Sequence, residues 1–577
     1  MRSDSGGSAD WAEQIRRAKR CRDRLWEELQ AEQVDGTFWV GELSSSALST
    51  ATAVAALALM DPETHAATIR RGLDWLAANR HTDGGFGDTV RSRSNLSTTF
   101  LVRSAIAIAD TNDRYRAIAE SCDRSINAAG GAAAVLAKYG SDRTFSVPIL
   151  MMGALGGLCD WSVIPRLPFE LAVLPREFYA AVRLPVVSYA LPALIAIGQL
   201  LHERNPSRNP VSRSLRGWSQ ERTLVKLESL QPSNGGFLEA TPLTSFVTMA
   251  LAAMGRQDNV VAARGTQFIK ASQRHDGSWP IDTNLSTWVT TLTVNAWGYD
   301  ARERLPQPDA TLDWLLDQQY DREHAFTGAA PGGWAWTPLP GGVPDADDTA
   351  GAVLAIRHLR GDRVVSAQVD AGQDWLRSLR NRDGGTPTFC RGWGTLPFDA
   401  STPELTAHHN QTSSHAGVGL CPKSLRYLER QQRDGLWAPL WFGNEKADRG
   451  VNWCYGTGRV LQSRLPSDCE ERALDALARL SPDGVPKNPG AEPVLEEVAV
   501  VLHGIACSRP DAPLLDSSLR WLCDRIDEDA HRAAAPIGLY FANLWYFEKL
   551  YPVVFSLAAL NQVLRVRRHR DLTSGTR

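Results

Sequence analysis

One segment recurs along most of the chain, and it constrains the fold more than any other feature of the sequence. Each copy is the end of an apolar helix, a turn with Asp-Gly or Gly-Gly, and an aromatic residue. The copies lie at 29–39, 73–88, 227–237, 268–279, 312–336, 375–385 and 425–437, and typical ones read FIKASQRHDGSW and LRYLERQQRDGLW. Such a unit buries its apolar face only against neighbouring copies, so the copies must stack.

Apolar second helices are predicted between the copies, for example at 52–60, 245–255, 291–297 and 349–359, and signals for strands are almost absent. In the later copies the turn glycines recur about every 50 residues, which fits two helices with their connections. This pattern predicts an all-α chain of helix pairs. Periodicity alone leaves both an open solenoid and a closed α/α barrel as alternatives.

The repeats also indicate how the chain is divided. The last four copies are contiguous, whereas the second and third are separated by residues 110–222, which contain no clear copy. We therefore predict two helical bodies, with a boundary near His275.

Composition excludes several classes of protein. A net charge of −3 does not indicate a polyanionic partner, so nucleic acid is not an expected ligand. Nine cysteines without a CxxC pair predict reduced thiols and a cytoplasmic location. The N-terminus lacks the apolar core of a signal peptide, and the longest apolar stretch, 186–201, is too short to span a bilayer. Peripheral association with one leaflet remains open.

Three carboxylates crowd the predicted start of one helix, in the sequence PDADDTA at 344–350. A helix start favours Asp through capping and through its dipole, so one or two of these residues are ordinary. Asp345, Asp347 and Asp348 together exceed what capping requires, and their mutual repulsion predicts that one of them holds a proton. Neighbours that accept hydrogen bonds would make that proton strongly acidic.

This motif within such repeats resembles the class II terpene cyclases, in particular the squalene–hopene cyclase family, over nearly the whole chain. The resemblance implies an all-α fold of two α/α barrels, the first inserted into the second, with a cavity between them. For this chain it implies a disordered tail over 1–9, a catalytic barrel of 10–34 plus 276–577 that carries the acids, and an inserted barrel over 35–275.

The resemblance also implies the chemistry, a proton-initiated cyclisation of a linear polyprenyl substrate. In the family the middle Asp of the motif protonates an alkene or epoxide, and that residue is Asp347 here, supported by Asp345 and Asp348. Termination by proton loss and by capture of water both remain open.

A second motif of the family supplies a histidine that acts with the acid. In this sequence the run Glu404-Leu-Thr-Ala-His408 places Glu404 and His408 on one helix face, so Glu404 is expected to orient His408. A protonated His408 beside Asp347 would increase its acidity and return its proton after turnover. The family also keeps a tyrosine near the acid in Tyr-Gly-Thr-Gly, and it is Tyr455 here.

A carbocation needs stabilisation without a nucleophile, and the faces of aromatic rings provide it. The residues that look equivalent to the family's cavity aromatics are Trp279, Trp336, Phe389, Tyr540 and Phe547. For each ring taken alone, packing in the core is the ordinary alternative.

The sequence departs from the family at the far end of the expected cavity. Arg449 replaces a family tryptophan, and the hydroxyl-rich run 44–50 occupies the stretch where acids would polarise the terminating water. Two alternatives therefore stay open beside a squalene-like substrate. One is a related class II cyclase for a prenyl diphosphate or a prenylated aromatic, with Arg449 in a polar recess, and the other is a non-catalytic α/α scaffold.

Metal and cofactor motifs are missing from the sequence. There is no DDxxD run for metal-assisted diphosphate ionisation and no persuasive Asp, Cys and His set for zinc. We expect no cofactor and no metal. The expected partner is an isoprenoid small molecule, and a monotopic membrane contact at the inner face of the cell membrane and a homodimer are further expectations.

Overall fold

A computed structural model describes residues 5–140, 143–174, 191–361, 366–389, 397–415, 420–539 and 544–574. In these ranges the chain is mostly helical, with three short antiparallel strand pairs, β1 with β2, β3 with β4 and β5 with β6. The strands are β1 (Gln33–Val34), β2 (Phe38–Trp39), β3 (Ser45–Ser46), β4 (Trp279–Pro280), β5 (Ile537–Leu539) and β6 (Leu544–Tyr546).

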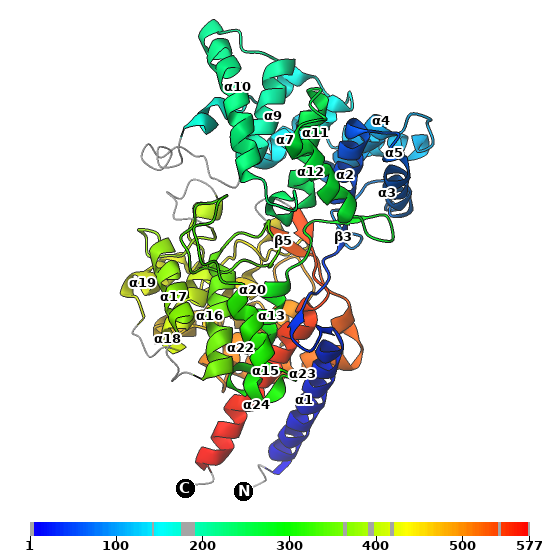
Figure 1. Ribbon diagram of the computed structural model, residues 1–577. Coiled ribbons are helices and arrows are strands. Elements are labelled where there is room, and N and C mark those ends of the chain that lie inside the picture. The colour runs from blue at the N-terminus through cyan, green and yellow to red at the C-terminus, as the bar shows by residue number, and fades with distance from the viewer. Residues whose placement is uncertain are drawn as a thin grey trace.

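One barrel combines the N-terminal helix with the second half of the chain, and we call it the split barrel (Figure 1). Its inner helices each pack on the next and the last packs on the first, which closes a ring: α13 (Ser286–Trp297), α16 (Ala346–Arg360), α18 (Pro403–His415), α20 (Trp453–Leu461), α22 (Leu495–Ser508) and α24 (Tyr551–Ser574). The outer helices are α15 (Pro308–Asp317), α17 (Ala367–Leu379), α19 (Pro422–Gln431), α21 (Ser467–Arg479), α23 (Pro513–Asp527) and α1 (Ser5–Ala31), and α14 (Ala301–Arg304) is a short connection.

The described helices between β2 and α13 form a second ring, the inserted barrel (Figure 1). Its inner helices are α2 (Ala47–Met60), α4 (Leu96–Ala109), α7 (Arg143–Leu155), α9 (Leu191–Arg204) and α11 (Thr241–Ala253), and α11 packs on α2. Around them lie α3 (Ala66–Ala78), α5 (Arg116–Ala128), α6 (Gly131–Tyr139), α10 (Pro210–Leu230) and α12 (Val260–Ala271).

The two barrels have separate hydrophobic cores. One core draws on residues 18–39 and 288–564, and the other lies mainly within 47–279. The chain therefore leaves the split barrel after Trp39 and returns to it before Trp288. The predicted fold class, all-α with two α/α barrels and one inserted into the other, is confirmed.

The N-terminus differs from the prediction. Helix α1 begins at Ser5, so residues 5–9 are helical where a disordered tail was expected over 1–9. No proline interrupts this stretch, and extending an existing helix costs far less than starting one.

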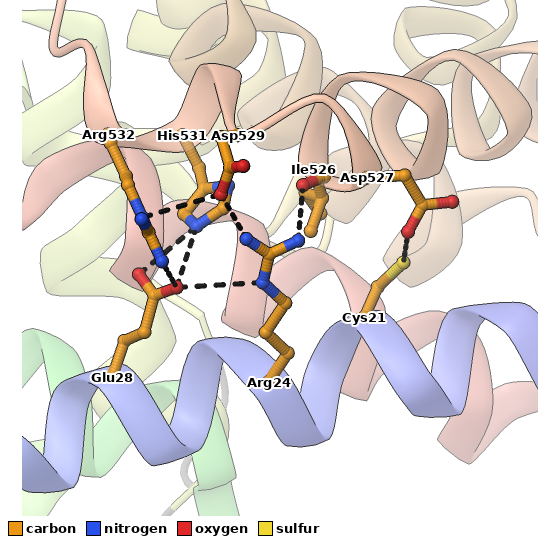
Figure 2. A network of polar contacts seen from close by, with 8 residues as sticks. All are labelled: Cys21, Arg24, Glu28, Ile526, Asp527, Asp529, His531 and Arg532. Atoms are coloured by element: carbon orange, nitrogen blue, oxygen red, sulfur yellow. Dashed lines mark hydrogen bonds and ion pairs between the residues drawn. The ribbon is translucent and has the colours of Figure 1, made fainter.

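Helix α1 is tied to the C-terminal half of the split barrel by a polar network (Figure 2). Arg24 donates from Nη1 to the carbonyl oxygen of Ile526 at 3.0 Å and also pairs with Asp529. Glu28 lies 3.1 Å from Nε2 of the fully buried His531 and 2.9 Å from Arg532. These contacts explain how the first residues of the chain and residues beyond 520 form one body.

The recurring aromatic residue forms the same pair of hydrogen bonds in both barrels, and we call this arrangement the repeat clamp. A buried tryptophan donates its indole N–H to a carbonyl near the end of the preceding outer helix, at 2.6–2.7 Å: Trp39 to Leu29, Trp279 to Ile269, Trp334 to Leu315 and Trp437 to Leu428. Its backbone N–H donates to a threonine hydroxyl on an inner helix at 3.0–3.1 Å: Thr290, Thr50, Thr349 and Thr457 respectively. The clamp therefore joins the outer helix of one repeat to the ring.

The turn glycine before each clamp is needed for its conformation and for space. Gly277 has φ of +94°, which favours glycine, and a Cβ there would lie 2.5 Å from the carbonyl oxygen of Arg71. A glutamine before the turn donates both to the carbonyl of the turn glycine and to a carbonyl of the next outer helix: Gln231, Gln273, Gln319 and Gln432. These bonds stack each repeat on its neighbour.

Within the described ranges, no helix combines the length and the apolar character needed to cross a membrane. The eight cysteines that lie in these ranges are free thiols. Cys390, the ninth, lies outside the described residues.

Candidate active site

The acid cluster lies at the start of α16, where the clamp of Trp334 positions it. The backbone N–H of Asp345 donates to the carbonyl oxygen of Trp334 at 3.0 Å. Asp345 is the N-cap of α16, and its Oδ1 accepts the N–H groups of Asp347 and Asp348, both at 2.9 Å. The same repeat that builds the ring therefore sets the place of the carboxylates.

Crowding and burial shift the titration of this cluster. Burial, with Asp345 and Asp347 nearby, raises the pKa of Asp348 well above its ordinary value. Burial also raises the pKa of Asp345 to about 7, although hydrogen bonds from Asp348 and from the backbone oppose it. The raised pKa values favour a protonated carboxyl in the cluster at neutral pH, chiefly because of burial, and the rise is larger for Asp348 than for Asp345.

Asp347 is paired with His408 from the neighbouring inner helix α18. Its Oδ1 lies 2.5 Å from Nδ1 of His408. The side chain of Asp347 is 17% exposed, against 4% for His408. Burial lowers the pKa of His408, Asp347 raises it, and Arg459 lowers it, with a net decrease. A neutral imidazole that donates from Nδ1 to Asp347 is the form that fits this balance.

Glu404 does not make the predicted contact. Its Oε1 accepts the backbone N–H of Leu440 at 2.7 Å, and no bond from Glu404 to His408 exists among the described contacts. The two residues share a face of α18, but Glu404 is in the first turn and faces the loop that follows Trp437. Burial raises the pKa of Glu404 to about 7. We correct its predicted role from orienting His408 to holding that loop.

Tyr455 lies near the acid, at the start of α20. Its ring is buried and stacks on Phe442, with the ring centroids 4.3 Å apart. Burial raises the pKa of Tyr455 well above its ordinary value, Arg459 opposes the rise, and Asp347 adds to it. The phenol therefore stays neutral beside the acid.

Four aromatic rings, Trp336, Phe389, Phe398 and Trp441, form a group that we call the aromatic cluster. Phe389 is central, with its centroid 6.2 Å from Trp336, 5.6 Å from Phe398 and 5.9 Å from Trp441. Trp336 and Trp441 each pack against the cores of both barrels. The predicted residues Trp336 and Phe389 thus come together where the barrels meet.

The other predicted aromatics do not join this cluster. Trp279 is fully buried in a repeat clamp and packs beside Gly72 in the inserted barrel, so its predicted contact with substrate is corrected to core packing. Phe547 is half-buried with the guanidinium of Arg91 over its ring at 4.8 Å, which gives it a contact between barrels. Tyr540 lies outside the described residues.

The structure adds three residues that sequence reasoning missed. Nη2 of Arg459 lies 3.8 Å from Oδ1 of Asp347, and the ring of Trp288 meets that of His408 edge-on at 6.3 Å. Trp441 completes the aromatic cluster. Arg459 lies four residues after Tyr455, and Trp441 lies four residues after Trp437. These spacings are the sequence signals from which the two residues could have been predicted.

A cavity of about 280 Å³ lies inside the split barrel behind the acid. His408, Arg459, His503 and Arg565 line it, and it extends to Tyr299, an exposed residue that follows α13. Arg449 is exposed in the segment before α20 and does not line this cavity.

Possible metal ligands gather elsewhere. Within the described residues, the only close group of three is Glu429, Asp468 and Cys469, on the outer helices α19 and α21. The acid cluster at α16 is hydrogen-bonded to its own helix start and to His408 instead.

Comparison with known proteins assigns the chain to a family. A family model described as the squalene-hopene cyclase N-terminal domain matches residues 23–217, and one described as the C-terminal domain matches residues 285–478. The chain belongs to the squalene–hopene cyclase family.

Its relatives share low sequence identity. The squalene–hopene cyclase of Alicyclobacillus acidocaldarius is 24% identical over 77% of this chain and 78% of that protein. The terpene cyclase-glycosyl transferase fusion protein fsoA of Humicola fuscoatra is 24% identical over 92% of this chain, which spans about half of that longer protein (49%). Drimenyl diphosphate synthase of Streptomyces showdoensis is 28% identical over 50% of this chain and 52% of that protein.

A solved structure shows the same fold. The ent-copalyl diphosphate synthase of Streptomyces platensis matches 95% of this chain and 99% of that one, with a TM-score of 0.54 and 17% identity.

Proposed function

We propose that this protein cyclises a linear isoprenoid, and that Asp347 starts the reaction by protonating a terminal alkene. The contact between Oδ1 of Asp347 and Nδ1 of His408, 2.5 Å, carries this proposal. Asp347 is the most exposed carboxyl of the cluster, while its two neighbours are buried and hydrogen-bonded.

The steps follow from this geometry. The proton of Asp347 goes to one alkene carbon, and the other carbon becomes a tertiary cation. The π electrons of the next alkene form a ring bond to that cation, and the charge moves along the chain. Aromatic faces such as that of Trp336 stabilise it, each by about 1–2 kcal/mol when desolvated. Loss of a proton or capture of water ends the sequence. Asp347 is then reprotonated through His408, whose Nε2 takes up a proton from water as its Nδ1 gives one to the carboxylate.

A hydrocarbon polyprene such as squalene is the first substrate class that we propose. A second class, with an anionic head group such as a diphosphate, is supported by Lys138. This lysine is largely buried near the junction of the barrels, and its Nζ donates to the hydroxyl of Ser97 on α4 at 3.2 Å. Burial lowers the pKa of Lys138, and Asp88 and Glu445 oppose the decrease. An ammonium group beside hydroxyl groups at a helix start can bind the oxygen atoms of a phosphate.

The test is conversion of defined substrates by the purified protein, followed by mass spectrometry. Squalene, farnesyl diphosphate, geranylgeranyl diphosphate and a prenylated hydroxybenzoate are incubated with wild type and with Asp347→Asn. We expect a cyclic product from at least one, and none from the variant. No conversion of any substrate, or equal conversion by Asp347→Asn, would overturn the proposal.

Lys138→Ala separates the two substrate classes. If the substrate carries an anionic head, the variant raises its KM and leaves kcat nearly unchanged, because the head group does not react. If the substrate is a hydrocarbon, KM does not move. Lys446→Ala, at an exposed lysine, is the matched control.

A further inference from the structure

We propose that Arg459 is a positioning residue that supplies the permanent positive charge beside Asp347 and keeps His408 neutral between turnovers. This inference rests on the proposed role of Asp347 as the acid. The sequence predicted that a protonated His408 supplies the positive charge beside Asp347, and the inference assigns that charge to Arg459 instead.

The geometry places both partners on the same oxygen atom. Oδ1 of Asp347 lies 2.5 Å from Nδ1 of His408 and 3.8 Å from Nη2 of Arg459. The side chain of Arg459 is only 10% exposed. Water therefore screens its charge little, and a guanidinium remains protonated at any pH at which the protein is folded.

The other contacts of Arg459 fix its position without neutralising it. Its Nη1 donates to Oε1 of Gln462, a neutral side chain one turn away, at 3.1 Å. Its Nη2 has no hydrogen-bond partner among the described residues. Asp347 is the carboxylate that this buried guanidinium meets.

Two electrostatic effects follow from one charge. Arg459 lies 3.8 Å from Oδ1 of Asp347, so its charge is placed to stabilise the negative charge that forms on this carboxyl when the proton leaves. The same charge disfavours a second cation nearby, and after burial it is a cause that lowers the pKa of His408. The sequence-based expectation was a protonated His408 as the activating charge, and Arg459 makes that charge unnecessary.

Other titratable groups around the pair come from each neighbouring inner helix and from β6. They are Asp345, Asp348 and His358 on α16, Glu404 and His409 on α18, Tyr455 on α20, His503 on α22, Arg565 on α24 and Tyr546 on β6. Burial lowers the pKa of His503 to about 3, with Arg459 and Arg565 adding to the effect, so His503 is neutral too. Arg459 is the arginine within 4 Å of Asp347, and Arg565 lines the same cavity.

The experiment measures the titration of His408 directly, in the full-length protein without substrate. The protein is labelled with ¹⁵N-histidine, and the His408 signals are assigned by their loss in His408→Gln. In wild type we expect His408 to stay neutral over the neutral range. In Arg459→Gln we expect its titration to move to higher pH. The matched control Arg565→Gln removes a positive charge from the same cavity and should leave the titration of His408 unchanged.

Turnover provides a second readout. Arg459→Gln should lower kcat about tenfold or more, because the charge that develops on Asp347 as its proton leaves then has no cation beside it. The titration of His408 should change in the same variant, which a merely structural defect would not produce. Arg459→Lys keeps the charge and should restore most of both properties.

Each outcome decides between the alternatives. A His408 titration that is the same in wild type and in folded Arg459→Gln overturns the inference. If Arg459→Gln does not fold, Arg459→Met, which keeps an apolar stem, is measured instead. If wild type converts no substrate, the proposed function fails, and the titration of His408 still tests the charge assignment.

Discussion

The two barrels are built in the same way but begin their inner helices with different residues. Repeat clamps join outer to inner helices in both, through Trp279 in the inserted barrel and through Trp39, Trp334 and Trp437 in the split barrel. In the split barrel, three inner helices of the described chain begin with acids that are wholly or mostly buried: Asp345, Asp347 and Asp348 at α16, Glu404 on α18, and Glu496 and Glu497 on α22. Helix α13 begins instead with the buried hydroxyls of Ser286 and Thr287. In the inserted barrel, inner helices begin with buried hydroxyls: Ser46 and Ser49 at α2, Ser97, Thr98 and Thr99 on α4, and Thr241, Thr244 and Ser245 on α11.

This difference shows where the scaffold keeps its chemistry. Each outer helix carries the chain back to the end of the barrel where the previous inner helix began. The inner helices of a ring therefore all begin at the same end of the barrel. Hydroxyls can be buried there at little cost once they are hydrogen-bonded, whereas carboxyls must lose their charge or find a partner. The split barrel therefore carries buried carboxyls at the caps and in the first turns of three inner helices, whereas the buried carboxyls Asp88 and Glu239 of the inserted barrel lie in the chain before α4 and α11.

The largest effect is expected from Asp347→Asn. The amide keeps the shape of the side chain but carries no acidic proton, so turnover should fall by at least about 1,000-fold, which is of the order of a lost general acid. Circular dichroism and the melting temperature should remain close to wild type, because Asp347 is the least buried of the three acids.

Glu497→Gln is the matched control at another inner helix start. Burial raises the pKa of Glu497 to about 8, although hydrogen bonds from Asn444 and Asn488 hold it down. Below that value the carboxyl is mostly protonated, and a neutral amide replaces a neutral acid. This variant should keep most of the activity, and a loss as large as that of Asp347→Asn would show that the difference between the barrels was misassigned.

Local interactions explain what the sequence could predict. The repeat, the N-cap at Asp345 and the proton held by crowded carboxyls all depend on residues within a few positions of one another. The contacts of Asp347 with His408 and Arg459 depend on closure of a ring of six helices in the described chain, and spacing predicted only the first of them.

Trp279 shows a local signal that was missed. It is the second residue after the turn glycine Gly277, as Trp334 and Trp437 are after theirs, and this position belongs to the clamp. Trp336 and Trp441 lie further along their loops and reach the junction of the barrels. Position within the repeat separates core rings from the aromatic cluster.

A smaller effect is expected from Trp336→Ala, which tests the aromatic cluster. Loss of a π face worth about 1–2 kcal/mol should slow turnover about tenfold and release products with fewer rings. Trp336→Phe keeps a flat ring and should retain most activity. Mass spectra of the products and melting temperatures check this. A lower melting temperature with an unchanged product pattern in both variants would instead make Trp336 a core residue.

The outer surfaces of the barrels give a third contrast. Helix α10 of the inserted barrel exposes Val211, Leu215, Trp218 and Val225, each by 50–75%, at spacings that place them along one face. Arg213, Arg222 and Lys226 are exposed beside them. An apolar face with basic neighbours suits the surface of an anionic membrane. We therefore propose α10 as the site of peripheral membrane association.

Flotation with vesicles of mixed neutral and anionic phospholipid checks this proposal. Trp218→Asp should lower the bound fraction several-fold, since it removes an apolar anchor and adds a repelled charge. Tyr299→Asp, at an exposed residue of the split barrel, should bind like wild type. Equal binding of the two variants to vesicles would contradict a role for α10. If the wild-type protein does not float with the vesicles, membrane association itself is contradicted.

The smallest effect is expected from the property that the barrels share. Trp279→Phe and Trp437→Phe each remove one indole N–H and leave a buried helix-end carbonyl, of Ile269 and of Leu428, without its donor. An unsatisfied buried acceptor costs about 1–3 kcal/mol, so each variant should lose that much stability to urea, and the two losses should agree within about 1 kcal/mol. Trp218→Phe, at an exposed site, should lose little. If the barrels unfold separately, the urea curve has two transitions, and each variant shifts only the one for its own barrel. A loss of stability in only one of the two variants would mean that the same clamp geometry contributes differently to the two barrels. The barrels would then differ in the interactions that hold them together as well as in the residues at their helix starts.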